Sequence, residues 1–152
     1  MDLGKLKWPV IILVVLGAIW FLSDAGASYM YKRYTQGEPG VNAELDKKNE
    51  AGLSFHGGLQ LRMLQFEVAK KFLQTAVDRY PDGANYWANM GRLAIIHERL
   101  GNFAEAADIM DMLVANNAHD RDDRVFTNDV LRARSEKLRE VHEIYPTSKF
   151  RK

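Results

Sequence analysis

The 152-residue sequence contains no cysteine, and this absence excludes three kinds of chemistry at once. Disulfides, thiolate metal sites and cysteine nucleophiles all require the missing side chain. The absence fits an oxidising or a reducing compartment, so it does not locate the protein. Proline is also scarce, with four residues, and together with 47% apolar residues this indicates an ordered, mostly helical chain.

The chain also has no excess of charge of either sign. Its 21 lysines and arginines nearly balance its 20 aspartates and glutamates, which leaves a net charge of +1. Nucleic-acid binding requires a broad basic surface, so DNA and RNA are not expected as partners. The length allows one modest domain and a short appendage, because domains usually contain about 100–150 residues.

Sequence motifs for catalysis are absent. The stretch "HERLG" begins at His97 like a zinc-protease helix, but Gly101 stands where the second histidine ligand is needed. The other histidines, His56, His119 and His142, are scattered without metal-ligand spacing. No phosphate-binding glycine loop or nucleophile elbow occurs. We therefore expect no enzymatic activity, no cofactor and no metal site.

A long apolar run stands near the amino terminus. Residues 8–22 read "WPVIILVVLGAIWFL" and carry no charge. Residues 9–28 form a 20-residue segment whose only charge is Asp24, and a helix of that length spans the ~30 Å of a bilayer core. Residues 1–34 are therefore predicted to form an uncleaved, single-pass transmembrane anchor.

Positive charge near the two ends of this run sets the predicted orientation. The amino terminus, Lys5 and Lys7 precede the run, and Lys32 and Arg33 follow it. Because short amino-terminal tails usually stay inside, we expect a bacterial inner-membrane protein with a cytoplasmic amino terminus and a periplasmic C-terminal domain. Two alternatives stay open: a domain that faces the cytosol, and a secreted protein cleaved at the small residues 25–27.

Gly17 and Asp24 are seven residues apart and therefore share one side of the predicted transmembrane helix. Gly17 leaves space for another helix to approach, so the pair is a candidate transmembrane contact. The alternative is that Asp24 is simply hydrated at the membrane surface.

The rest of the chain contains an internal repeat. Residues 35–41 are predicted to be a linker, and Asn42 can cap the first helix of a domain over residues 42–152. Within it, matching residues recur at an offset of 37 and predict two helix-turn-helix units, about 49–83 and 84–118. The matched pairs include Leu53 and Met90, Phe66 and Phe103, Ala69 and Ala106, and Leu73 and Met110.

The second unit resembles the tetratricopeptide repeat family. The family pattern W-x2-L-G matches Trp87, Met90 and Gly91, its turn matches Leu100-Gly101, and its second helix matches Phe103 and Ala106. The unit departs from the family in length, since it has 37 residues against about 34. The resemblance implies stacked helical hairpins and a role in binding other proteins.

A further amphipathic helix is predicted over about 122–144, where it would cap the second unit. The predicted fold is therefore all-α: a transmembrane helix followed by a short tetratricopeptide-like solenoid with a long C-terminal capping helix.

By the same resemblance, the first helices of the two units line a concave groove. Asn89 and Arg92 are the type of pair that holds a peptide main chain and a carboxylate. The alternative is a plain solvated helix face. The groove positions are Lys48, Phe55, Asn85, Asn89, Arg92 and Ile95.

Three functions are compatible with these features. The first is a membrane-anchored scaffold without enzymatic activity, which binds or assembles a larger membrane-associated complex. The second is a permanent accessory subunit of such a complex. The third is a secreted soluble binding module. All three require other proteins as partners.

Overall fold

The structure is a computed structural model that describes residues 3–144, with side chains described for 7–17, 19–20 and 23–144. This part of the chain is all-α, with eight helices and no strand. The helices are α1 (Leu3–Leu22), α2 (Asp24–Tyr34), α3 (Ala43–Arg62), α4 (Phe66–Arg79), α5 (Tyr86–Arg99), α6 (Phe103–Ala115), α7 (Ala118–Arg121) and α8 (Asn128–Val141).

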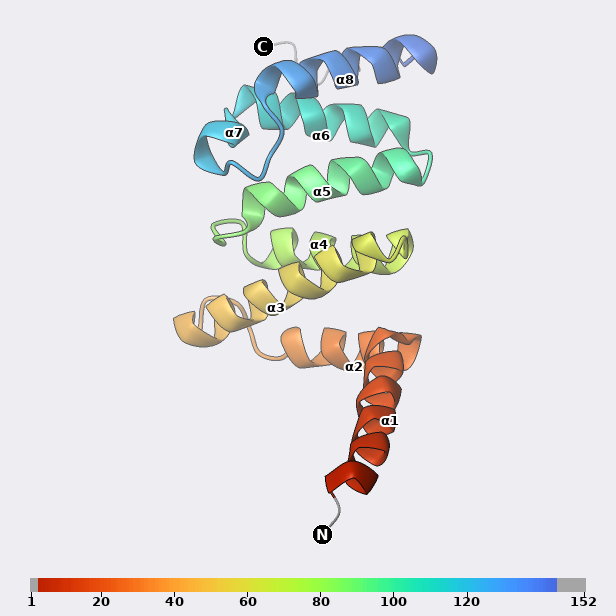
Figure 1. Ribbon diagram of the computed structural model, residues 1–152. Coiled ribbons are helices and arrows are strands. Elements are labelled where there is room, and N and C mark those ends of the chain that lie inside the picture. The colour runs from red at the N-terminus through yellow and green to blue at the C-terminus, as the bar shows by residue number, and fades with distance from the viewer. Residues whose placement is uncertain (1–2, 145–152) are drawn as a thin grey trace.

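Helices α2 to α6 and then α8 stack as successive layers, the short α7 lies at one edge beside α6, and α1 projects from one end of the stack (Figure 1). The pairs α3–α4 and α5–α6 are helical hairpins, and their corners repeat at the offset seen in the sequence: α3 ends at Arg62 and α5 at Arg99, while α4 begins at Phe66 and α6 at Phe103. Asn42 caps α3 as predicted, because its Oδ1 accepts hydrogen bonds from the N–H groups of Glu44 and Leu45, both at 3.1 Å.

Buried side chains hold the layers together. Leu73 of α4 and Leu93 and Ile96 of α5 form one cluster between the two hairpins. A second cluster joins α6 to α8, where Met110 and Leu113 pack with Leu131 and Leu138. The last helix thus covers the second hairpin, although it begins at Asn128 and not near residue 122. The intervening residues form α7 and a loop that places Val125 in this second cluster.

The prediction of a transmembrane anchor is wrong. Among the described residues, no helix combines the length and the apolar character needed to cross a membrane. The predicted 20-residue span is interrupted at Ser23, whose hydroxyl accepts a hydrogen bond from the N–H of Gly26 at 3.3 Å and starts a new helix. The uncharged part of α1, residues 8–22, is about 22 Å long at ~1.5 Å per residue, short of the ~30 Å of a bilayer core.

Several expectations fall with that anchor. The predictions of a single-pass topology and of a bacterial inner-membrane protein with a periplasmic domain are wrong, because both require that anchor. The candidate contact of Gly17 and Asp24 loses its premise of one continuous helix, since Gly17 belongs to α1 whereas Asp24 is the first residue of α2. Helix α2 is instead a layer of the stack. Its Ala27 belongs to a buried cluster with Leu53 of α3 and Phe72 of α4. The hydroxyl of its Tyr31 lies 2.9 Å from that of Thr75 in α4.

Candidate functional site

A groove of about 480 Å³ lies between α3 and α5, the first helices of the two hairpins. We call it the α3–α5 groove. Its residues on α3 recur every three or four positions and therefore share one helix face. The residues that decide its chemistry are Ser54, Phe55, Gly58, Arg62, Asn85 and Arg92.

Arg92 is the central cation of the groove. Its side chain is half-buried, and its Nη1 donates hydrogen bonds to the backbone oxygen of Ser54 and to Oδ1 of Asn89, both at 3.3 Å. Gly58 lets the guanidinium lie close to α3, because a Cβ there would be only 3.3 Å from Nη1 of Arg92, a tight contact that would shift the guanidinium slightly. The guanidinium is therefore held against α3 before any ligand arrives.

The groove is electropositive. Burial lowers the pKa of Arg92 from its ordinary value, and repulsion by Arg124 and then Arg62 lowers it further, whereas Asp122 raises it. Arginine still stays protonated at neutral pH. Arg62 and Arg92 thus bring two guanidinium groups to the groove, where an anionic ligand relieves their repulsion, whereas Arg124 is already paired with Asp122 at 2.7 Å.

Asn89 does not face the groove. Its side chain is fully buried, and its Nδ2 donates to the hydroxyl of Ser54 at 2.6 Å while its Oδ1 accepts from Arg92. It therefore positions Arg92 and has no free face for a peptide. Asn85 lines the groove, but its amide is also engaged, since Nδ2 donates to Glu50 and Oδ1 accepts from Arg124.

The other predicted positions divide into two groups. Phe55 lines the groove with 63% of its surface exposed. Lys48 is exposed on α3 and Ile95 is half-buried on α5, and both lie outside the lining of the α3–α5 groove. The structure therefore brings together Phe55, Asn85 and Arg92.

Sequence reasoning missed two cations of this site. Arg62 was detectable, because it follows Phe55 by seven residues and so lies on the same helix face. Arg124 was not, because it reaches the groove from the loop after α7, where its guanidinium binds Asp122 at 2.7 Å and Asn85 at 2.8 Å. No periodicity links that loop to α5.

Comparison of the chain with protein-family models, with curated proteins and with solved structures finds no match. The resemblance to tetratricopeptide repeats therefore stays a prediction that rests on the residues quoted above.

Proposed function

We propose that this chain is a protein-binding module without enzymatic activity, and that its α3–α5 groove binds an extended, acidic segment of a partner protein. The observation that carries this proposal is the pair of guanidinium groups, Arg62 and Arg92, beside the exposed ring of Phe55. Such a module serves as a scaffold in a larger protein assembly.

The physical argument rests on preorganisation. Arg92 is already held by Ser54 and Asn89, so less side-chain entropy is lost when it binds a carboxylate. Its partial burial reduces solvent screening, which strengthens a charge-assisted hydrogen bond. Phe55 adds apolar contact area, and arginine and aromatic residues dominate the energetics of protein interfaces.

Fluorescence anisotropy with a labelled peptide tests the proposal. A peptide that carries four glutamates and one leucine should bind the full-length chain, and its affinity should fall as salt is raised. The double variant Arg62→Ala/Arg92→Ala should lose most of this binding, while a peptide with lysines in place of the glutamates should not bind. Equal binding of both peptides would contradict an electropositive recognition site.

A second candidate function is that of a permanent subunit of a protein complex. It is favoured by α1, whose apolar side chains from Trp8 to Trp20 are each about half exposed or more where they are described. Contiguous apolar surface of this kind marks interaction sites. Purification of the chain from its native cells should then give a complex of fixed stoichiometry that survives high salt. Recovery of the chain alone would contradict this second candidate.

A further inference from the structure

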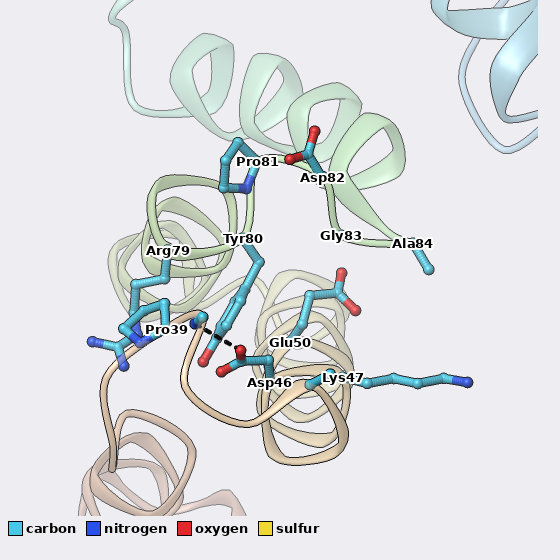
Figure 2. Close-up of a pocket in the computed structure, with 12 residues that line it drawn as sticks. Pro39, Asp46, Lys47, Glu50, Arg79, Tyr80, Pro81, Asp82, Gly83 and Ala84 are labelled. Carbon is cyan, nitrogen blue, oxygen red and sulfur yellow. Dashed lines mark hydrogen bonds between the residues drawn. The ribbon is translucent and has the colours of Figure 1, made fainter.

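A second pocket, of about 440 Å³, lies at the start of α3 and shares no lining residue with the α3–α5 groove. Figure 2 shows it between the first turns of α3 and the turn that follows α4. We call it the acidic pocket, after Asp46 and Glu50 of α3 and Asp82 of the turn, which line it together with Tyr80. Asp46 and Glu50 are one helical turn apart and so share a face of α3.

The carboxylates of the acidic pocket are bound only by neutral donors. Asp46 Oδ2 accepts from the N–H of Gly40 at 2.8 Å. Glu50 is 4% exposed, and it accepts from the backbone and side-chain N–H groups of Asn85, both at 2.9 Å, and from Ser54. Within residues 3–144, none of the three carboxylates forms an ion pair. A carboxylate as buried as Glu50 is normally paired with a cation. The cation that responds to its charge is Arg124, whose pKa is raised by the hydrogen bond to Asp122 first and also by Glu50, and which binds the same Asn85 side chain.

The two cations at the rim do not fill this role. Arg79 points to the other side of Tyr80, where its Nη2 donates to the backbone oxygen of Gly37 at 2.6 Å (Figure 2). Lys47 extends away from the pocket in the same view. The pocket therefore presents Asp46, Glu50 and the ring of Tyr80, while Asp82 stands at the rim with its carboxylate directed away from Asp46 (Figure 2).

Tyr80 supplies an independent sign of a missing ligand. Its side chain is 8% exposed, and its hydroxyl has no hydrogen-bond partner in the described part of the protein. Figure 2 shows its ring along the pocket, with the hydroxyl directed to the end where Asp46 and Pro39 stand. A buried hydroxyl without a partner destabilises the fold, so an N–H donor in the pocket would remove an existing penalty.

We propose that the acidic pocket binds an organic cation, an alkylammonium or guanidinium group with an apolar stem. Asp46 and Glu50 supply the counter-charge with Asp82 at the rim, and the Tyr80 hydroxyl accepts an N–H. Arg79 lies 5.9 Å from the centroid of the Tyr80 ring on one side, and the other face of the ring offers a cation–π contact. Pro39 and Pro81 at the rim suit the stem. The volume lies in the range of small-molecule sites.

This inference goes beyond the proposed function and does not depend on it, since the α3–α5 groove recognises the opposite charge. The same cationic group occurs in two sources, an arginine or lysine side chain of a partner protein and a free small diamine. One titration with two probes distinguishes them.

The experiment follows the backbone N–H signals of the ¹⁵N-labelled full-length chain by NMR. N-acetyl-arginine amide stands for a partner's side chain, putrescine for a free diamine, and N-acetyl-citrulline amide is the neutral control of the same shape. The arginine probe should shift the signals of Asp46, Glu50 and Asp82, and the citrulline probe should not. Stronger binding of the arginine probe assigns the site to a protein side chain, and stronger binding of putrescine assigns it to a small amine.

Three variants complete the test. Asp46→Asn/Asp82→Asn keeps an oxygen for the Gly40 N–H but removes two charges, and it should weaken binding about tenfold or more. Tyr80→Phe should weaken binding by a few-fold while the melting temperature stays equal or rises, because the unpartnered hydroxyl is removed. Asp78→Asn, an exposed carboxylate on α4, is the matched control and should bind as the wild type does. Equal affinity for arginine and citrulline probes, or wild-type affinity in the double variant, would overturn the inference.

Discussion

Leu64 and Gly101 occupy the same place in the two hairpins, and both have a left-handed backbone, with φ of +60° and +80°. The hydrogen bonds of the two corners match as well: the N–H of Gln65 donates to the oxygen of Gln60 at 3.0 Å, and that of Asn102 to His97 at 2.8 Å. The geometry of the corner is thus the same although only one sequence has glycine there. Packing of the hairpin imposes a conformation that leucine disfavours.

We predict that Leu64→Gly stabilises the protein. The left-handed conformation costs a side-chain residue about 1–2 kcal/mol, and the larger entropy of glycine in the unfolded chain offsets about 0.5–1 kcal/mol of that gain. Since Leu64 is 70% exposed, little burial is lost. Urea unfolding should therefore show a net gain between zero and about 1.5 kcal/mol. The matched change Gly101→Leu should have the opposite sign, and destabilisation by Leu64→Gly would contradict the argument.

A second prediction contrasts two glycines inside helices. A Cβ at Gly52 would lie 2.3 Å from the ring of Tyr34, whereas a Cβ at Gly91 would meet Val125 at an ordinary 3.9 Å. Helix propensity alone favours alanine at both positions by about 1 kcal/mol. We expect Gly91→Ala to stabilise by roughly that amount and Gly52→Ala to destabilise by about 1–3 kcal/mol, because it pushes α2 away from α3. Equal urea midpoints for the two variants would show that α2 does not pack on α3 in solution.

These glycines also show where sequence reasoning stopped. Helix propensity identifies Gly52, Gly57 and Gly58 as weak points of α3. It does not show that the three glycines face three different side chains, which are Tyr34, Leu73 and Arg92 respectively. The close approaches depend on tertiary packing, which periodicity does not encode. The corners of the hairpins, by contrast, were predictable, because turn residues and the offset of 37 are local features.

The error at the amino terminus has a different origin. The apolar run and α1 both end at Leu22, but the small residues after it carry Asp24 as their only charge, so composition indicated one span over residues 9–28. A capping signal was nevertheless present, since Ser23 precedes Asp24, an acidic residue in the first turn of α2. The burial of Asn89 had no such signal, because it depends on Ser54 of the neighbouring helix.

The third prediction concerns the cover that α8 provides. Leu131 is buried against α6, and its neighbour Val130 is about half exposed. Leu131→Ala should destabilise the protein by about 2–5 kcal/mol through the cavity that it leaves. Val130→Ala should change stability by less than about 0.5–1 kcal/mol. Thermal and urea unfolding both measure this contrast, and similar effects of the two changes would mean that α8 is not docked on α6.

A fourth prediction is a loss of stability on mild acidification. Burial lowers the pKa of both His56 and His97 below the ordinary value of 6.5, and for His97 the charge of Lys70 adds to the effect. Below pH ~6.5 the unfolded chain therefore binds protons that the folded chain does not, so the free energy of unfolding falls as pH drops.

The urea midpoint should accordingly decrease from pH 7.5 to pH 5.5, a window above the ordinary titration of carboxylates at about pH 4. The variant His97→Gln should show a shallower pH dependence, whatever its absolute stability. A midpoint that rises toward pH 5.5 would contradict neutral, buried histidines.

The last prediction separates recognition from packing on α5. Arg92→Ala should weaken binding of the acidic peptide by about 1.5–3 kcal/mol, the range for a lost charge-assisted hydrogen bond, and should lower stability by only about 1 kcal/mol through the lost contact with Ser54. Met90→Ala should do the reverse, since Met90 packs between the clusters of the two hairpins, and its truncation should cost roughly 2 kcal/mol of stability.

Gly58→Ala adds a third case. Its new Cβ displaces the Arg92 guanidinium without removing its charge. If positioning matters as much as charge, peptide affinity falls in Gly58→Ala while its salt dependence stays that of the wild type. Unchanged peptide affinity in both Arg92→Ala and Gly58→Ala would mean that the α3–α5 groove is not the binding site.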